Sequence, residues 1–187
     1  MKKNKILYLF LTVFFISTLL LTNGCKLFDS SSEKTPEPPK TQLTAKKITL
    51  YFSDKDAIYL VPEIREVKID KNADKTDLAE KIVKELIKGP EDENLFRTIP
   101  PEAKLLGIEI KDEIAYADFS EEIKTKHWGG STGETMTVMS IVNSLTELEG
   151  IKKVQILIEG KTEETLVGHL YTKEPLERDK NIIKPQD

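Results

Sequence analysis

Apolar residues recur at helical spacing in two stretches of this chain. In the first, residues 77–88, leucine, isoleucine and valine return every three or four positions and form one apolar face. Gly89-Pro90 ends this pattern, because glycine favours the position after a helix and proline cannot continue one. Asp74 and Thr76 are both suitable N-cap residues for this helix.

The second helical stretch, residues 131–149, follows a glycine-rich loop. Ser131 and Glu134 have the spacing of a capping box, in which each side chain accepts a hydrogen bond from the backbone amide of the other residue. Gly150 follows the last apolar position, where many helices end with a left-handed residue. The apolar stripe consists of Val138, Ile141, Val142, Leu145 and Leu148. We therefore expect a helix with Ser131 and Glu134 at its N-cap.

Shorter apolar and alternating segments predict the strands. These segments are residues 48–52, 58–69, 106–110, 114–119 and 154–158. The turn-like sequence Lys111-Asp112-Glu113 makes 105–119 a hairpin, and 165–171 is expected to form a short final element. The resulting order, ββαββαβ, favours an α+β fold. We expect a two-layer sandwich in which two helices pack on one face of a mixed or antiparallel sheet.

Two connections have no regular apolar pattern. The first, residues 91–104, is expected to be held in place by Leu95, Phe96 and Ile99. The second, residues 120–130, is expected to be a loop or short helix that leads into the second long helix.

The N-terminal 24 residues have the pattern of a secretory signal peptide. Three lysines precede a nearly uniform apolar run, Ile6 to Thr22, and Gly24 is a small residue before Cys25. This arrangement resembles a bacterial lipobox, so we expect cleavage after residue 24 and lipidation of Cys25. The alternative is an uncleaved membrane anchor, since about 17 residues is the lower limit for a spanning helix. Both interpretations place the rest of the chain on the extracytoplasmic face of the cell membrane.

Composition sets the boundaries of the folded domain. Residues 25–45 are rich in serine, threonine, proline and charge, so we expect a disordered linker after the lipidated cysteine. The domain is expected to cover residues 46–175, followed by a polar C-terminal tail at 176–187. Because Cys25 is the only cysteine, no disulfide within the chain can support this domain.

Charge and metal-ligand spacing exclude several functions. The formal net charge is −4 and the chain has no basic stripe, so nucleic acid is not an expected partner. His127 and His169 are the only histidines, and no cluster has the spacing of a zinc site. We expect neither a metal nor a cofactor.

A short motif in the glycine-rich loop suggests a hydrolase. Residues 129–133 match G-x-S-x-G, the nucleophile elbow, and His169 follows in the chain order of such enzymes. The elbow requires an apolar strand directly before the serine, whereas residues 124–128 are mostly polar. A small serine hydrolase that uses Ser131 is therefore the least favoured alternative, and we expect no enzymatic activity.

The sole tryptophan lies just before the second helix. His127, Trp128, Gly129 and Gly130 form a candidate interaction loop, in which Trp128 is an aromatic anchor for a protein partner. The other interpretation is that Trp128 folds back onto the core and closes the loop, since tryptophan is usually well buried.

A set of short motifs, taken in order, resembles the GerMN domain family of sporulation and spore germination lipoproteins. The motifs are Leu50-Tyr51-Phe52, Tyr59-Leu60-Val61-Pro62, Leu86-Ile87-Lys88-Gly89-Pro90, Ala117-Asp118-Phe119-Ser120, Gly130-Ser131 with Glu134, residues 141–147, residues 154–158 with Gly160, and Gly168-His169. Tandem copies occur in the family, whereas this chain has room for one. The resemblance covers roughly Lys46 to Glu177.

The resemblance implies a non-catalytic interaction domain. It implies a lipid-anchored protein that helps to assemble or localise an envelope complex in sporulation or germination, through protein partners and self-association. The alternative is an accessory or sensor lipoprotein that binds a ligand or the cell wall, which requires a concave pocket with convergent polar groups.

Overall fold

The computed structural model describes residues 42–185. The predicted signal peptide, the lipidation of Cys25 and most of the predicted linker therefore lie outside the described residues. Within residues 42–185, no helix has both the length and the apolar character needed to cross a membrane.

The described chain contains six strands and three helices. Their bounds are β1 Leu43–Ser53, β2 Leu60–Asp70, α2 Lys75–Lys88, β3 Leu105–Lys111, β4 Ile114–Phe119, α3 Glu122–Thr125, α4 Ser131–Leu145, β5 Lys153–Ile158 and β6 Leu176–Glu177. β1 and β2 form an antiparallel hairpin. The other strands form a mixed sheet in the order β3-β4-β5-β6, in which only the β4–β5 pair is parallel.

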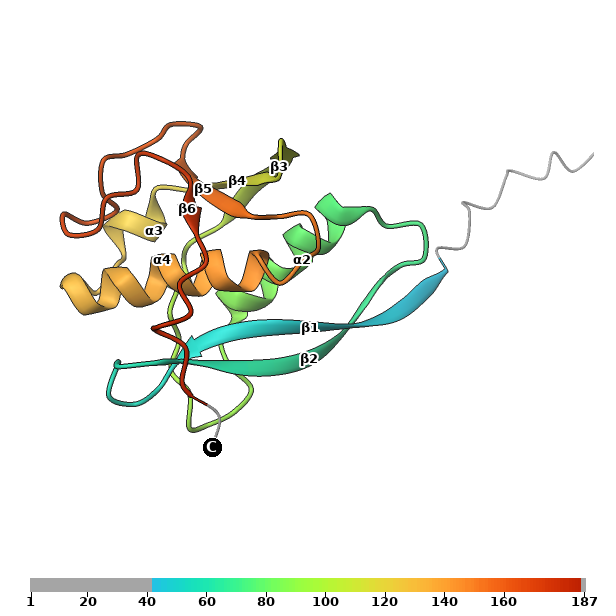
Figure 1. Cartoon of the computed structure of the whole chain (residues 1–187), viewed down its shortest axis with the longest axis horizontal. Helices are drawn as coiled ribbons and strands as arrows, with labels where there is room; N and C mark the ends of the chain where they lie inside the picture. The colour runs from blue at the N-terminus through green and yellow to red at the C-terminus, as the bar shows by residue number, and fades with distance from the viewer. Residues whose placement is uncertain (1–41, 186–187) are drawn as a thin grey trace, which may run out of the picture. The chain divides into compact units, whose positions relative to one another are not determined.

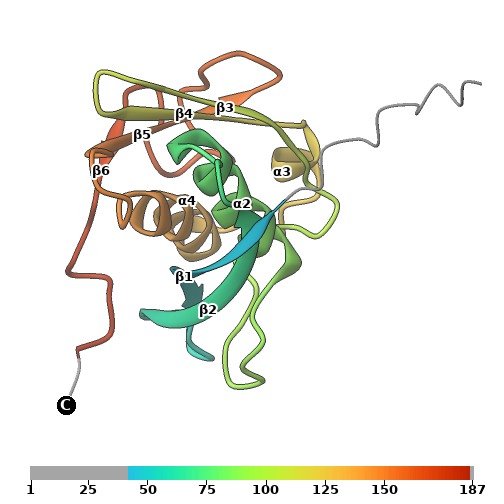
Figure 2. The same ribbon diagram turned by 90° about the vertical axis from the view of Figure 1, so that its right-hand side faces the viewer.

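The two long helices lie between the two sheets. Figures 1 and 2 show α2 and α4 as a middle layer, with the β1–β2 hairpin on one side and the mixed sheet on the other. Contacts agree with this arrangement, because α4 touches β1 as well as β5, and α2 touches β1 as well as β3. The predicted α+β class is confirmed, and both helices share one face of the mixed sheet.

The single sheet of the sequence prediction is wrong, since the first hairpin forms a sheet of its own. The reason is the character of α4, which is buried on nearly every side and not only along its apolar stripe. Its polar positions are small residues that are satisfied by neighbouring segments. The hydroxyl of Ser144 accepts from the Tyr51 amide at 3.0 Å, and that of Ser140 lies 2.7 Å from the Thr98 hydroxyl. A helix with two buried faces needs a covering layer on each side.

The first long helix has the ends that its sequence predicts. Asp74 is the N-cap and forms a capping box with Asp77, which settles the choice between Asp74 and Thr76. Gly89 is the C-cap residue and has φ +90. The guanidinium of Arg97 donates to the carbonyl of Lys88 at 2.8 Å, and so satisfies a carbonyl that the helix leaves free.

The predicted polar tail at 176–187 is wrong over its described part. β6 pairs with β5, and the backbone of Ile182 and Lys184 then bonds to Leu60 of β2. Between them, Arg178 stacks over the Tyr51 ring, with the guanidinium 5.0 Å from the ring centroid. The polar residues of this segment thus bind buried polar groups of the domain, which composition alone does not reveal.

Two smaller boundaries also differ from the prediction. β1 begins at Leu43, so residues 43–45 belong to the domain and not to the linker, because they pair with residues 68–70 of β2. The predicted final element at 165–171 is a loop closed by one bridge between Thr165 and Tyr171.

Candidate functional site

The loop between α3 and α4 carries the predicted interaction residues. Gly129 and Gly130 have φ values of +79 and +81, a backbone conformation that side-chain-bearing residues rarely adopt. These two glycines turn the chain from α3 into α4, and Gly130 is the N-cap residue.

The predicted cap by Ser131 and Glu134 is wrong. α4 begins at Ser131 itself, and no side chain caps its first turn. Glu134 is instead fully buried, and its two carboxylate oxygens accept from the amides of Val167 and His169 at 2.9 and 2.8 Å. Glu134 therefore holds the 165–171 loop against α4. Its carboxylate is not available for a capping box, because it accepts from these two backbone amides outside the helix.

His127 is fixed by hydrogen bonds on both ring nitrogens. The Gly129 amide donates to Nδ1 at 2.9 Å, so a neutral ring carries its proton on Nε2, which donates to the Thr137 hydroxyl at 2.9 Å. Burial lowers the pKa of His127, although the nearby Glu134 carboxylate raises it. The ring is therefore neutral at pH 7 and serves as a support for the loop.

Trp128 packs against the His127 ring and is exposed to solvent. Its ring stacks on His127 with the centroids 5.2 Å apart and the planes at 25°. It also borders Gly133, where an added Cβ would lie only 3.1 Å from the indole nitrogen. Trp128 is nevertheless 52% exposed, so it does not fold back into the core. The exposure that an aromatic anchor needs is present, and binding itself stays a prediction.

A groove of about 320 Å³ lies beside Trp128. It is formed where the β1–β2 turn, the segment before Thr98 and the start of α4 meet. The lining residues are Ser53, Asp54, Lys55, Ala57, Phe96, Arg97, Trp128, Gly133 and Met136. We call this feature the aromatic groove, because Trp128 and Phe96 are exposed aromatic side chains of its lining.

Phe96 is the functional candidate that the sequence prediction missed. We expected Leu95, Phe96 and Ile99 to hold the 91–104 connection, and Ile99 is indeed fully buried. Phe96, however, is 52% exposed, while its backbone forms two hydrogen bonds with Ser53 at 2.8 and 3.2 Å. This bridge holds the aromatic side chain at the end of β1, and no local sequence pattern predicts the bridge.

The hydrolase alternative lacks its structural context. A nucleophile elbow needs a strand that runs directly into the serine, whereas α3 and a loop precede Ser131. The backbone amide of His169 is bound by Glu134, and no hydrogen bond joins Ser131 to a histidine between residues 42 and 185. In that same range, no group of three or more potential metal-binding side chains occurs.

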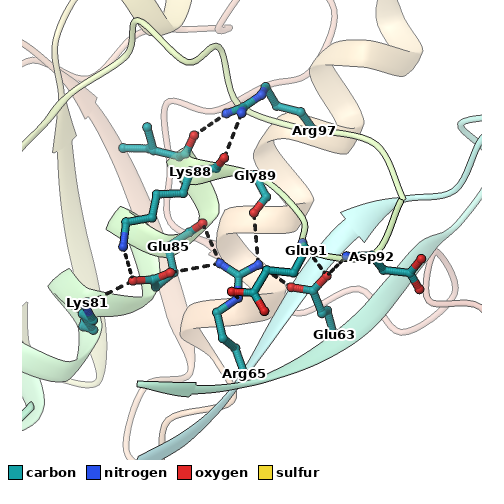
Figure 3. A network of polar contacts seen from close by, with 10 residues as sticks. Glu63, Arg65, Lys81, Glu85, Lys88, Gly89, Glu91, Asp92 and Arg97 are labelled. Atoms are coloured by element: carbon teal, nitrogen blue, oxygen red, sulfur yellow. Dashed lines mark hydrogen bonds and ion pairs between the residues drawn. The ribbon is translucent and has the colours of Figure 1, made fainter. Parts of the chain in front are cut away.

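Arg65 is the centre of a buried charged cluster between β2 and α2 (Figure 3). Its guanidinium donates to the Glu85 carboxylate and to the Gly89 carbonyl, both at 3.0 Å, and also to the Glu63 carboxylate. It lies over the ring of Phe52, 5.8 Å from the centroid. The cluster joins the hairpin to the end of α2.

The charged cluster stabilises the fold and is not suited to proton transfer. Burial by itself raises the pKa of Glu85, but hydrogen bonds from Lys88, Arg65 and Lys81 outweigh burial and lower it to about 2. A carboxylate with so low a pKa is a weak general base at neutral pH. The aromatic groove is therefore the stronger candidate for function.

Comparison with known proteins identifies the family. This is an α+β domain, and residues 49–164 match the family Germane, described as sporulation and spore germination. The match covers more than half of the chain, so the chain belongs to the Germane family. A search of curated proteins found no match.

Solved structures with the same fold include a proposed lipoprotein and the domains of a sporulation protein. A proposed lipoprotein of Clostridium perfringens is 26% identical, with TM-score 0.51, and the match covers 71% of this chain and 87% of the other. The tandem GerMN domains of the sporulation protein GerM from Bacillus subtilis are 24% identical, with TM-score 0.57 and coverages of 82% and 51%. The first GerMN domain of that protein is 19% identical, with TM-score 0.51 and coverages of 73% and 98%. This chain therefore spans about half of the tandem structure and nearly all of the single domain.

Acid is expected to weaken the domain through His127. Because the pKa of His127 is lowered on folding, the unfolded chain binds the proton more readily. The free energy of unfolding is then highest above the ordinary histidine pKa of about 6.5, and it falls as the pH drops from there toward the folded pKa. Urea unfolding of wild type at pH 7.5 and pH 5.5 measures this loss.

The control for this pH dependence is His127→Gln, which does not titrate. The difference between pH 7.5 and pH 5.5 should be smaller in His127→Gln than in wild type. An equal difference in both proteins would mean that His127 does not carry the pH dependence.

Proposed function

We propose that this chain is a membrane-tethered extracytoplasmic lipoprotein whose Germane domain is a docking module. In this proposal the aromatic groove binds a protein partner and helps to assemble or localise an envelope complex in sporulation or spore germination. The domain is not an enzyme. The observation that carries the docking role is the pair of half-exposed aromatic residues, Trp128 and Phe96, on one groove.

The support for docking comes from the contacts that hold these two residues in place. Neighbouring exposed apolar side chains often mark an interaction site, and aromatic residues are enriched where binding energy concentrates. Trp128 is supported by the hydrogen-bonded ring of His127, and the backbone of Phe96 is bridged to Ser53. A surface that is already ordered loses less conformational entropy on binding than a flexible one.

The tether is supported by the N-terminal sequence and by one comparison. Residues 1–24 have the pattern of a signal peptide, and Cys25 occupies the place of a lipidated cysteine. One protein with this fold is itself a proposed lipoprotein. A lipid at Cys25 together with the proposed linker would hold the domain at the outer face of the cell membrane.

Isolation of the tagged protein from membranes tests the docking role. We expect membrane proteins to be recovered with wild type from sporulating cells, and to be lost or strongly reduced with Trp128→Ala and with Phe96→Ala. The reason is that truncation of a central aromatic anchor typically costs more than 1 kcal/mol of binding, roughly fivefold or more in affinity.

Tyr171→Ala is the matched control for this isolation, because Tyr171 is equally exposed, at 52%, but is not part of the groove lining. It should leave the recovered proteins unchanged. Recovery of cell-wall enzymes alone, from vegetative and sporulating cells alike, would contradict the sporulation role and favour a cell-wall accessory function.

A further inference from the structure

We propose that the aromatic groove binds residues 36–39 of a second copy of this chain. This inference rests on the proposed function, since it names an occupant for the same groove. The segment reads Pro36-Glu37-Pro38-Pro39, which contains the P-x-x-P pattern. Proline-rich sequences of this kind favour the polyproline II conformation, which aromatic-lined grooves bind at a low entropic cost.

The lining of the groove suits a proline-rich segment. Trp128 and Phe96 supply exposed aromatic surface, and Met136 and Ala57 add apolar surface between the loops. In addition, the indole N–H of Trp128 is hydrogen-bonded to no residue of the 42–185 range. A polyproline II backbone leaves its carbonyl groups without internal partners, so one of them can accept from this indole.

Charge favours an acidic residue in the occupant. Lys55 and Arg97 line the groove together with Asp54, whose carboxylate already accepts from two backbone amides of its own turn, at 2.9 and 3.2 Å. Lys55 is exposed and forms no ion pair with the described residues. Glu37 lies in the middle of the P-x-x-P segment, so it can approach Lys55 while the prolines contact the aromatic rings.

Chain length excludes binding of the segment to its own groove. The groove borders Ser53 at one end of β1, and the segment enters the domain at the other end, at Leu43. At about 3.3 Å per residue, β1 separates these two ends by roughly 33 Å. Pro39 precedes Leu43 by four residues, which span at most about 14 Å. The occupant must therefore come from a second copy.

Trp128 is the only tryptophan, so its fluorescence reports directly on the groove. We would titrate the full chain, at low concentration in detergent, with a synthetic peptide of residues 33–41. The expected result is a saturable blue shift of the emission, because the indole loses water on binding. A peptide with alanine at positions 36, 38 and 39 should give no shift.

Phe96→Ala should weaken the binding of the 33–41 peptide by about fivefold or more, and Tyr171→Ala should leave it unchanged. Absence of a shift, or an equal shift with the alanine peptide, overturns the proposal.

Carbodiimide coupling of mixed full-length chains tests whether two copies take part. Chains with light and heavy isotopes are mixed and coupled, and the products are mapped by mass spectrometry. We expect a Lys55–Glu37 bond between one light and one heavy chain, which is absent in Glu37→Gln. A bond found only within single chains overturns the assignment to a second copy.

The two proposals fail separately. If the peptide does not bind, but Trp128→Ala still loses the membrane proteins, the occupant is a different protein and the docking role stands. If neither experiment responds to Phe96→Ala, the groove is not a docking site.

Discussion

Arg65→Met is expected to lower the free energy of unfolding by about 3–5 kcal/mol, the cost of removing one partner from a buried ion pair. The side chains of Glu63 and Glu85 are only 11% and 7% exposed, so both carboxylates lose a buried charged partner without gaining water. The Gly89 carbonyl also loses a donor, which loosens the junction between the hairpin and α2. Urea unfolding, monitored by circular dichroism, measures the change.

The matched control for Arg65 is Lys84→Met. Lys84 pairs with Glu80 on the surface of α2, and the two side chains are 54% and 37% exposed. Exposed pairs contribute about 0–1 kcal/mol, so this variant should unfold almost like wild type. If Arg65→Met and Lys84→Met cost the same, the buried cluster is not what joins the hairpin to α2.

Glu134→Ala is expected to cost about 3 kcal/mol or more, because hydrogen bonds to a charged group contribute about 1.5–3 kcal/mol each and two are lost. The amides of Val167 and His169 would remain without their acceptor. The effect should also be local. Hydrogen exchange at these two amides should become much faster, while the β4–β5 pair keeps its protection.

Ser131→Ala distinguishes the uncapped first turn of α4 in the structure from the capping box that the sequence predicts. A true N-cap serine contributes about 1 kcal/mol, so the capping box predicts that loss. In the structure Ser131 is the first residue of α4 and its side chain caps nothing, so we expect a change within about 0.5 kcal/mol. A loss of 1 kcal/mol or more would restore the capping box.

Ser131 and Glu134 show which parts of the fold can be predicted from the sequence and which cannot. The periodicity of 77–88 and of 131–149 locates both long helices, and alternation locates the strands, because local patterns record which face is buried. The pair Ser131 and Glu134 also has a local pattern. The pattern misleads here because an amide thirty or more residues away competes for the same carboxylate.

The arrangement of the layers cannot be predicted from the sequence, for a similar reason. Ser140, Asn143 and Ser144 look like a solvent face, yet all are buried in α4. Their partners are distant, such as Asp179, whose carbonyl accepts from the Asn143 side chain at 2.9 Å. Small polar residues that find such partners do not differ in sequence from exposed ones. The two-layer prediction rested on the order of the elements, which does not show that α4 has a second buried face.

Only one of the two exposed aromatic residues of the groove can be predicted from the sequence. Trp128 stands out as the sole tryptophan beside two glycines. Phe96 does not stand out, since an apolar residue in a connection is ordinarily part of the core. Its exposure depends on the bridge to Ser53, which forms only when β1 and the 91–104 connection meet.

The docking role of the aromatic groove is tested most directly by a photo-crosslinking amino acid at position 96, in living cells. The same amino acid at position 171, an equally exposed aromatic site that does not line the groove, is the control. We expect discrete adducts with an envelope protein or a second copy from position 96, their loss in the Trp128→Ala background, and none from position 171. Equal adducts from both positions, or adducts from position 96 that persist without Trp128, would contradict the account.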